Sequence, residues 1–143
     1  MIVKSILSAK GRDVATIAPT ATLAEATKIL SERKIGALVV TGAGGRIIGI
    51  LSERDIVRAL AQHGGEALQL PLTDVMTRKV VTCTPRDTVA VLMERMTAGK
   101  FRHLPVTDDG ALTGIISIGD VVKYRLTELQ FEQDAMRDYI QTA

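Results

Sequence analysis

This sequence of 143 residues has few aromatic residues and only a small net charge. It has no Trp, two Phe and two Tyr, so the stacking platforms that bind single-stranded nucleic acid are essentially absent. Its 18 Lys and Arg are nearly balanced by 16 Asp and Glu, and the formal charge of +2 gives no strong basic field. We therefore expect neither nucleic acid nor a membrane surface as a partner.

Cysteine and long apolar runs are equally limited. Cys83 is the only cysteine, which excludes an internal disulfide, and its apolar flanks are typical of a buried strand. No apolar run approaches the ~20 residues that span a bilayer, and the N-terminus lacks the basic and apolar regions of a signal peptide. These absences predict a cytoplasmic protein that is neither exported nor embedded in a membrane.

The sequence does contain an internal repeat. Residues 14–40 match residues 80–106 at a constant offset of 66, and the offset becomes 65 after a turn that is one residue shorter in the second copy. A duplicated unit tolerates such a difference because turns lie at the surface. Matching positions include Val14/Val80, Pro19/Pro85, Gly49/Gly114, Ser52/Ser117 and Asp55/Asp120. The chain is therefore predicted to hold two copies of one structural unit.

Each copy has the same succession of local patterns. A short β-prone run, at residues 14–17 or 80–83, ends before a proline, and an apolar stripe with helical spacing then follows a Thr suited to cap it. Two apolar runs around a polar turn predict a hairpin, and a second helix is expected to begin near Asp55 or Asp120. The predicted order is strand, helix, strand, strand, helix.

These patterns predict an α+β fold. A βαββα unit of about 60 residues is marginal alone, so we expect two pseudo-two-fold-related units to pack through their sheets and leave a cleft between them. The predicted divisions are 1–66 for the first unit, 67–126 for the second, and 127–143 for a C-terminal helical extension. Residues 64–71 have the composition of a linker between the units.

The pattern Gly-x-x-Ser-x-x-Asp closes both hairpins, at residues 49–55 and 114–120. One interpretation is a helix N-cap, in which the Ser hydroxyl accepts a backbone N–H and the acid lies in the first turn. The other adds ligand binding, because such a helix end presents free amides to a phosphate and the carboxylate can accept hydrogen bonds from a ribose diol. The two interpretations are compatible.

With this motif in both copies, residues 1–126 resemble a tandem pair of cystathionine-beta-synthase (CBS) domains, a Bateman module of the stand-alone bacterial type. The resemblance extends to four strings: Ile-Gly-Ala-Leu-Val-Val at 35–40, Ser-Glu-Arg-Asp at 52–55, Arg-His-Leu-Pro-Val at 102–106 and Ser-Ile-Gly-Asp-Val-Val at 117–122. It implies a regulatory module for energy or redox sensing, not an enzyme. The implied ligand is AMP, with ATP, ADP or NAD(H) as candidates for the other site.

The resemblance also implies which residues bind the ligand. Asp55 and Asp120 hold ribose hydroxyls, Ser52 and Ser117 face the ribose or the phosphate, and strand residues of the same copy surround the adenine. The full implied set is Thr16, Ile17, Ala18, Gly36, Ala37, Leu38, Ser52, Arg54 and Asp55 in the first copy, and Thr82, Cys83, Thr84, Arg102, His103, Leu104, Pro105, Ser117, Ile118, Gly119 and Asp120 in the second.

The two implied sites differ in their cations. Arg54 has no counterpart in the second copy, where Gly119 takes its place. Conversely, Arg102 and His103 replace two small residues of the first copy, so the positive charge of the second site comes from its strand. We therefore expect two sites of different affinity.

Other functions stay open. S-adenosylmethionine shares the adenosine group, but its sulfonium gains nothing from these cationic residues. A structural dimerisation unit with vestigial sites and an enzyme acting on nucleotides are further alternatives. No Ser-His-Asp group, paired carboxylates or metal-binding cluster is visible in the sequence, so no catalytic residue, metal or catalytic cofactor is predicted.

Three remaining features favour structural roles. Cys83 aligns with Ile17, which indicates core packing, and His63 at a predicted helix end is expected to cap carbonyls or to be solvated. The C-terminal helix carries a heptad-like seam of Val122, Leu126, Leu129, Gln133, Met136 and Ile140. The seam packs either on its own domain or on a second chain. CBS pairs commonly form dimeric discs, so we expect a homodimer, with an unknown downstream protein.

Overall fold

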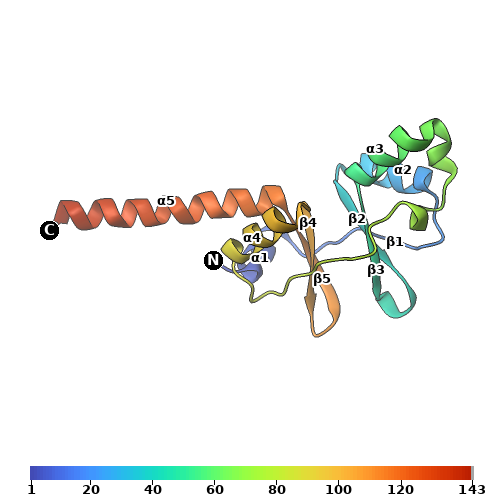
Figure 1. The fold of residues 1–143 in the computed structure, drawn as a ribbon. Coiled ribbons are helices and arrows are strands. Elements are labelled where there is room, and N and C mark those ends of the chain that lie inside the picture. The colour runs from blue at the N-terminus through green and yellow to red at the C-terminus, as the bar shows by residue number, and fades with distance from the viewer. Residues whose placement is uncertain (143) are drawn as a thin grey trace. The chain divides into compact units, whose positions relative to one another are not determined.

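The computed structural model describes residues 1–142 and confirms the α+β class (Figure 1). The strands form one three-stranded and one two-stranded sheet. In chain order the elements are α1 (Val3–Lys10), β1 (Thr16–Ile17), α2 (Leu23–Arg33), β2 (Ala37–Thr41), η1 (Ala43–Gly45), β3 (Ile47–Ser52), α3 (Glu53–His63), η2 (Gly64–Gln69), η3 (Leu72–Asp74), α4 (Val89–Gly99), β4 (His103–Asp108), β5 (Ala111–Ser117) and α5 (Ile118–Thr142).

The chain folds into two compact units that do not follow its linear order. The Asp55 unit contains residues 13–81 and 109–113, and the Asp120 unit contains residues 1–12, 82–108 and those from 114 onward. This grouping differs from the linear division after residue 66. The segment that precedes each repeat packs with the other repeat, so residues 1–12 join the second copy and residues 67–81 join the first.

The Asp55 unit is built on the sheet β1-β2-β3. β1 runs parallel to β2, with Thr16 opposite Val39, and β2 runs antiparallel to β3, with Ala37 opposite Ser52. The helix α2 begins where the Thr22 hydroxyl accepts the Glu25 N–H, at 3.2 Å. Apolar side chains from the sheet, α2, α3 and the following turns form one core; they include Leu23, Ala26, Leu38, Val40, Leu51, Ile56, Leu72 and Met76.

Residues 64–71, which have the composition of a linker, pack within the Asp55 unit. Residues 64–69 form η2, in which Ala67 is fully buried in the core of the Asp55 unit. The Leu23 N–H also donates to the Leu70 carbonyl, at 2.9 Å. The Gly64-Gly65 pair follows the end of α3, and the apolar residues after it are held by burial and by the backbone hydrogen bond.

The Asp120 unit contains β4, the part of β5 from Gly114 onward, and α1, α4 and α5, and β4 pairs with β5 in the two-stranded sheet. Its core includes Val3, Ile6 and Leu7 of α1 and Leu92 and Met96 of α4. The predicted strand at residues 80–83 is reduced to one parallel bridge between Cys83 and Val106, with backbone hydrogen bonds to Pro105 and Thr107. The remaining backbone of that run makes no ladder among the described residues, and Val81 is exposed.

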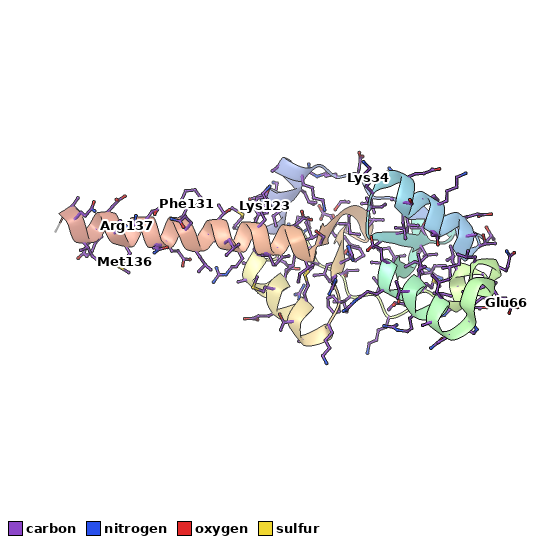
Figure 2. All side chains as sticks on the ribbon, turned by 90° about the horizontal axis from the view of Figure 1, so that it is seen from above. Lys34, Glu66, Lys123, Phe131, Met136 and Arg137 are labelled. Carbon is purple, nitrogen blue, oxygen red and sulfur yellow. The ribbon has the colours of Figure 1, made fainter. Side chains whose placement is uncertain are left out.

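The helix α5 spans 25 residues, and most of it lies outside the core of its unit. Val121 is its only buried residue, and Tyr124 packs partly buried against the core. The apolar side chains of the predicted seam are exposed: Val122, Leu126, Leu129, Met136 and Ile140. Figure 2 shows Phe131, Met136 and Arg137 projecting from the part of α5 that runs beyond the rest of its own unit. The seam therefore does not pack back on the unit that carries it.

Candidate functional site

The first Gly-x-x-Ser-x-x-Asp motif lies where β3 ends and α3 begins. The Asp55 N–H donates to Ser52 Oγ at 3.3 Å, and the Ser52 N–H donates back to Asp55 Oδ2 at 3.0 Å. This reciprocal pair is a capping box, and the Ser52 hydroxyl adds a hydrogen bond of 3.2 Å to the same carboxylate oxygen. The N-cap interpretation is confirmed, and the cap holds the Asp55 carboxylate at the positive end of the helix dipole.

The second motif has the same geometry where β5 ends and α5 begins. The Asp120 N–H donates to Ser117 Oγ at 3.2 Å, and the Ser117 N–H donates to Asp120 Oδ2 at 2.9 Å. The Ser117 hydroxyl donates to that oxygen at 3.0 Å. Both copies therefore present a Ser and an Asp in one arrangement at a helix N-terminus.

The glycine of each motif leaves room for an apolar side chain from the segment before the other repeat. A Cβ at Gly114 would lie 2.6 Å from Leu7 Cδ2, and a Cβ at Gly49 would clash with the Met76 sulfur. Leu7 is 1% exposed and Met76 is 7% exposed, so neither can easily move aside. A larger residue at either glycine would displace the segment beside the motif.

The surroundings of Asp55 supply mostly neutral donors. Asp55 is 6% exposed, and its Oδ1 accepts from the Thr77 hydroxyl at 3.4 Å. Thr77 is held on β3 by two backbone hydrogen bonds to Ile50, both of 2.9 Å. The nearest cation is Arg58, whose Nη1 lies 3.7 Å from Asp55 Oδ1 and whose side chain is 68% exposed.

Asp120 instead receives a direct cation. Lys10, the last residue of α1, places its Nζ 2.6 Å from Asp120 Oδ2 and 2.9 Å from the Ile115 carbonyl. Burial alone would raise the pKa of Asp120, but the hydrogen bond and charge of Lys10 and the donors of Ser117 outweigh it and hold the pKa below its usual value. Asp120 therefore stays ionised, with Lys10 as its counter-ion.

The strand residues implied by the resemblance lie at two levels of the Asp55 unit. The Gly36 carbonyl accepts the Glu53 N–H at 3.0 Å, which places Gly36 at the first turn of α3. In the Asp120 unit the Arg102 carbonyl accepts the Ile118 N–H at 2.8 Å, which places Arg102 at the first turn of α5. Thr16 pairs with Val39, two residues along β2 from the Ala37–Ser52 pair, or about 7 Å away. Residues 16–18 therefore lie along the sheet from the Ser52–Asp55 cap and do not adjoin it.

Several of the implied side chains are not available to a ligand. Leu38 and Leu104 are fully buried, and Cys83 is 1% exposed. Burial, followed by the negative charge of Asp87, raises the pKa of the Cys83 thiol to about 12. Cys83 is thus a core residue, as its alignment with Ile17 predicted, and only its backbone can face a ligand.

Sequence reasoning missed Lys10 and Thr77, which contact the two carboxylates. Lys10 and Thr77 are 67 positions apart, so the 66-residue repeat does not align them. A long Lys side chain reaches the carboxylate from a backbone position where a short Thr side chain would not. No signal in spacing identifies either residue, because each approaches from the segment before the other repeat.

The described residues hold neither a metal-binding cluster nor a membrane-spanning helix. Residues 1–142 contain no group of three or more His, Cys, Asp or Glu side chains that could hold a metal ion. None of the described helices is both long and apolar enough to cross a bilayer.

Comparison with known proteins identifies the family. The model of the CBS domain matches twice, over residues 3–62 and 72–127, and the chain belongs to this family. Each match starts within or next to the segment that packs with the other repeat. The recognition of a CBS pair from the sequence is thereby confirmed.

Solved CBS structures share the fold over most of the chain. The CBS-domain protein ATU1752 from Agrobacterium tumefaciens is 51% identical, with a TM-score of 0.84, and the match covers 87% of this chain and 92% of that one. The protein PAE2072 from Pyrobaculum aerophilum, solved with AMP, is 30% identical with a TM-score of 0.75 over 84% and 89% of the two chains. The CBS pair of MJ0100, solved with 5′-methylthioadenosine and S-adenosylmethionine, is 27% identical with a TM-score of 0.79 over 90% and 98%.

A curated relative is longer than this chain. The mitochondrial CBS protein CBSX3 of Arabidopsis thaliana is 36% identical over 124 residues, which are 84% of this chain and 60% of the relative. The chain thus spans about three fifths of that protein, and the similarity concerns the CBS pair.

Proposed function

We propose that this protein is a regulatory module that binds AMP at its two Ser-x-x-Asp helix ends. The observation that carries the proposal is the duplicated cap, which fixes an Asp carboxylate and a Ser hydroxyl at each helix N-terminus in a CBS fold. The related protein PAE2072 was solved with AMP, which supports the ligand class. ATP, ADP and NAD(H) share the same AMP half and are candidates for the other site.

Each chemical group of AMP has a partner of suitable kind. A carboxylate accepts about four hydrogen bonds, so Asp55 and Asp120 can bind ribose hydroxyls while they keep their caps. The phosphate is favoured by the helix N-terminus and by the exposed guanidinium of Arg54 in the first site and of Arg102 in the second. The adenine then lies along the strand residues, 16–18 in the first copy and 82–84 in the second.

The regulatory role follows from how a binding module acts. A ligand shifts a conformational equilibrium only by the difference in its affinity for the two states, so the module reports nucleotide level through a shape or partner change. We propose no catalytic step for the module. We propose a cytoplasmic location and a downstream protein partner for the module.

S-adenosylmethionine is a second candidate ligand because MJ0100 was solved with it. The cations near each cap favour an anionic ligand over a sulfonium, so we expect AMP to bind more tightly. Competition calorimetry between AMP and S-adenosylmethionine distinguishes the two. Displacement of bound AMP by S-adenosylmethionine at lower concentration than AMP itself would reverse the assignment.

Binding itself is tested by a thermal-shift panel of AMP, ADP, ATP and NAD with the intact chain. A ligand at one hundred times its dissociation constant stabilises by about 2.7 kcal/mol, which raises the melting temperature by several degrees in a protein of this size. Asp55→Asn and Asp120→Asn should each weaken nucleotide binding at one site by about 1.5–3 kcal/mol, and the exposed Asp13→Asn is the matched control. A panel with no shift for any nucleotide rejects the proposal.

We also propose that two chains pair through the α5 seam. A helix end with no neighbours is marginally stable in water, and here it exposes Leu129, Met136 and Ile140 on one stripe. Glu132 and Arg137 flank this stripe at positions that face each other across a parallel, in-register pair. A second copy of the chain would cover the stripe and form this ion pair twice.

A further inference from the structure

The segment before each repeat supplies one polar group to the carboxylate of the other repeat. In the Asp55 unit, the Thr77 N–H donates to the Ile50 carbonyl at 2.9 Å, and the Thr77 hydroxyl donates to Asp55 Oδ1 at 3.4 Å. A neutral residue thus satisfies both the strand carbonyl and the carboxylate.

In the Asp120 unit one ammonium performs both roles. Ile115 is the repeat partner of Ile50, and its carbonyl accepts from Lys10 Nζ at 2.9 Å. The same Nζ donates to Asp120 at 2.6 Å. Lys10 therefore replaces an amide and a hydroxyl with a single positive charge.

The exchange changes the charge of the second cap. Lys10 is 32% exposed at its side chain and Asp120 is 20% exposed, so the two form a close, partly shielded and neutral pair. Arg58 does not match this at Asp55, because its guanidinium is 3.7 Å away and 68% exposed, where solvent screens it.

We propose that Lys10 is a specificity-determining residue of the second site, which makes that site select ligands carrying an anionic group. The Ser117 N–H, the Ser117 hydroxyl and Lys10 all donate to Asp120 Oδ2, so a ribose diol can bind through Oδ1 while Lys10 keeps its ion pair. The Lys10 ammonium uses two of its three N–H groups, on Asp120 and on the Ile115 carbonyl, and its flexible four-carbon stem lets the third reach an anion beside the ribose. A 5′-phosphate supplies that anion and an uncharged nucleoside does not. The inference rests on the proposed function, since it assigns a role within the same site.

The test compares AMP with adenosine, because the two differ only in the phosphate. Calorimetry is performed on the full chain in an Asp55→Asn background, which weakens the first site so that binding reports the second. Lys10→Met, which removes the charge at similar length, should lower the preference for AMP over adenosine by about tenfold. Lys10→Arg, which keeps the cation, should retain most of the preference.

Lys4→Met is the matched control, since Lys4 is an exposed lysine on the same helix and forms no hydrogen bond or ion pair with Asp120 in the part of the chain that the structure describes. It should leave the preference unchanged. An unaltered preference in Lys10→Met, or an equal loss in Lys4→Met, overturns the role of Lys10. Failure of the starting protein to bind either ligand overturns the proposed function and the inference with it, which is a different result from binding without selectivity.

Discussion

The close approach of Leu7 to Gly114 makes a quantitative prediction about stability. Gly114→Ala places a methyl group 2.6 Å from Leu7 Cδ2 and 3.0 Å from Leu7 Cδ1, against the roughly 3.5–4.0 Å that carbon atoms prefer. Leu7 is 1% exposed in the core of the Asp120 unit, so relief requires α1 or β5 to shift. Overpacking of this kind costs about 1–3 kcal/mol.

The same substitution brings an opposing gain. Replacing glycine where φ is not positive stabilises by about 0.4–1 kcal/mol, because the unfolded chain loses freedom. The net expectation is a loss of about 1–2 kcal/mol. At about 0.3 kcal/mol per degree for 143 residues, the melting temperature should fall by about 3–7 °C.

Calorimetric or circular-dichroism melting of three variants separates packing from the backbone effect. Gly65→Ala is the control, because a Cβ at Gly65 meets nothing within 4 Å and its φ is not positive. It should leave the stability unchanged or slightly raised. In the double variant Leu7→Ala/Gly114→Ala, the alanine at 114 should no longer destabilise, since the clashing side chain is gone. Equal melting temperatures for Gly114→Ala and Gly65→Ala would refute the packing argument.

Three further predictions concern titration, thiol access and pairing of chains. The fold lowers the pKa of Asp87 and of Asp120: burial would raise both values, but hydrogen bonds from Thr84 and Arg95 to Asp87, and from Lys10 and Ser117 to Asp120, outweigh it. The stabilisation that these carboxylates give is therefore complete above the unfolded pKa of about 3.9 and is lost as the pH falls below that value. Asp120→Asn should flatten this part of an acid-unfolding curve, and an unchanged curve would contradict the prediction. Cys83, with its pKa raised to about 12, should resist thiol reagents at pH 8 until denaturant is added, and rapid native labelling would show that it is not buried. If the α5 helices pair in parallel and in register, Met136→Cys should form a disulfide between two chains under mild oxidation. Phe131→Cys lies off the seam and should form none. A Met136→Cys variant that stays monomeric would reject the pairing.

The sequence predicted the elements whose signals are local. Thr22 and Ser52 marked the helix starts because a hydroxyl accepting the backbone N–H three residues on is encoded within a few positions. The hairpins followed from apolar runs around polar turns, and the alignment of Cys83 with Ile17 predicted its burial. Repeating each signal at a fixed offset removed most of the ambiguity that a single short segment carries.

The sequence failed where tertiary packing decided the outcome. Residues 64–71 resembled a linker because of their glycines, but burial of Ala67 and the Leu23–Leu70 hydrogen bond hold them in the Asp55 unit. Residues 80–83 have β propensity but find only one bridge partner. Lys10 and Thr77 could not be assigned to the site, because their contacts depend on which unit each preceding segment joins.

Residues 1–12 and residues 67–81 each pack with the other repeat, which makes the two repeats interdependent for folding. A fragment that ends at residue 66 would lack Ala67, Leu72 and Met76, which complete the core of its own repeat, and would carry α1 without the core that receives it. A fragment with the remaining residues would in turn lack Val3, Ile6 and Leu7. Neither half of the sequence therefore holds a complete core of its own, and the duplicated chain is expected to fold as one unit.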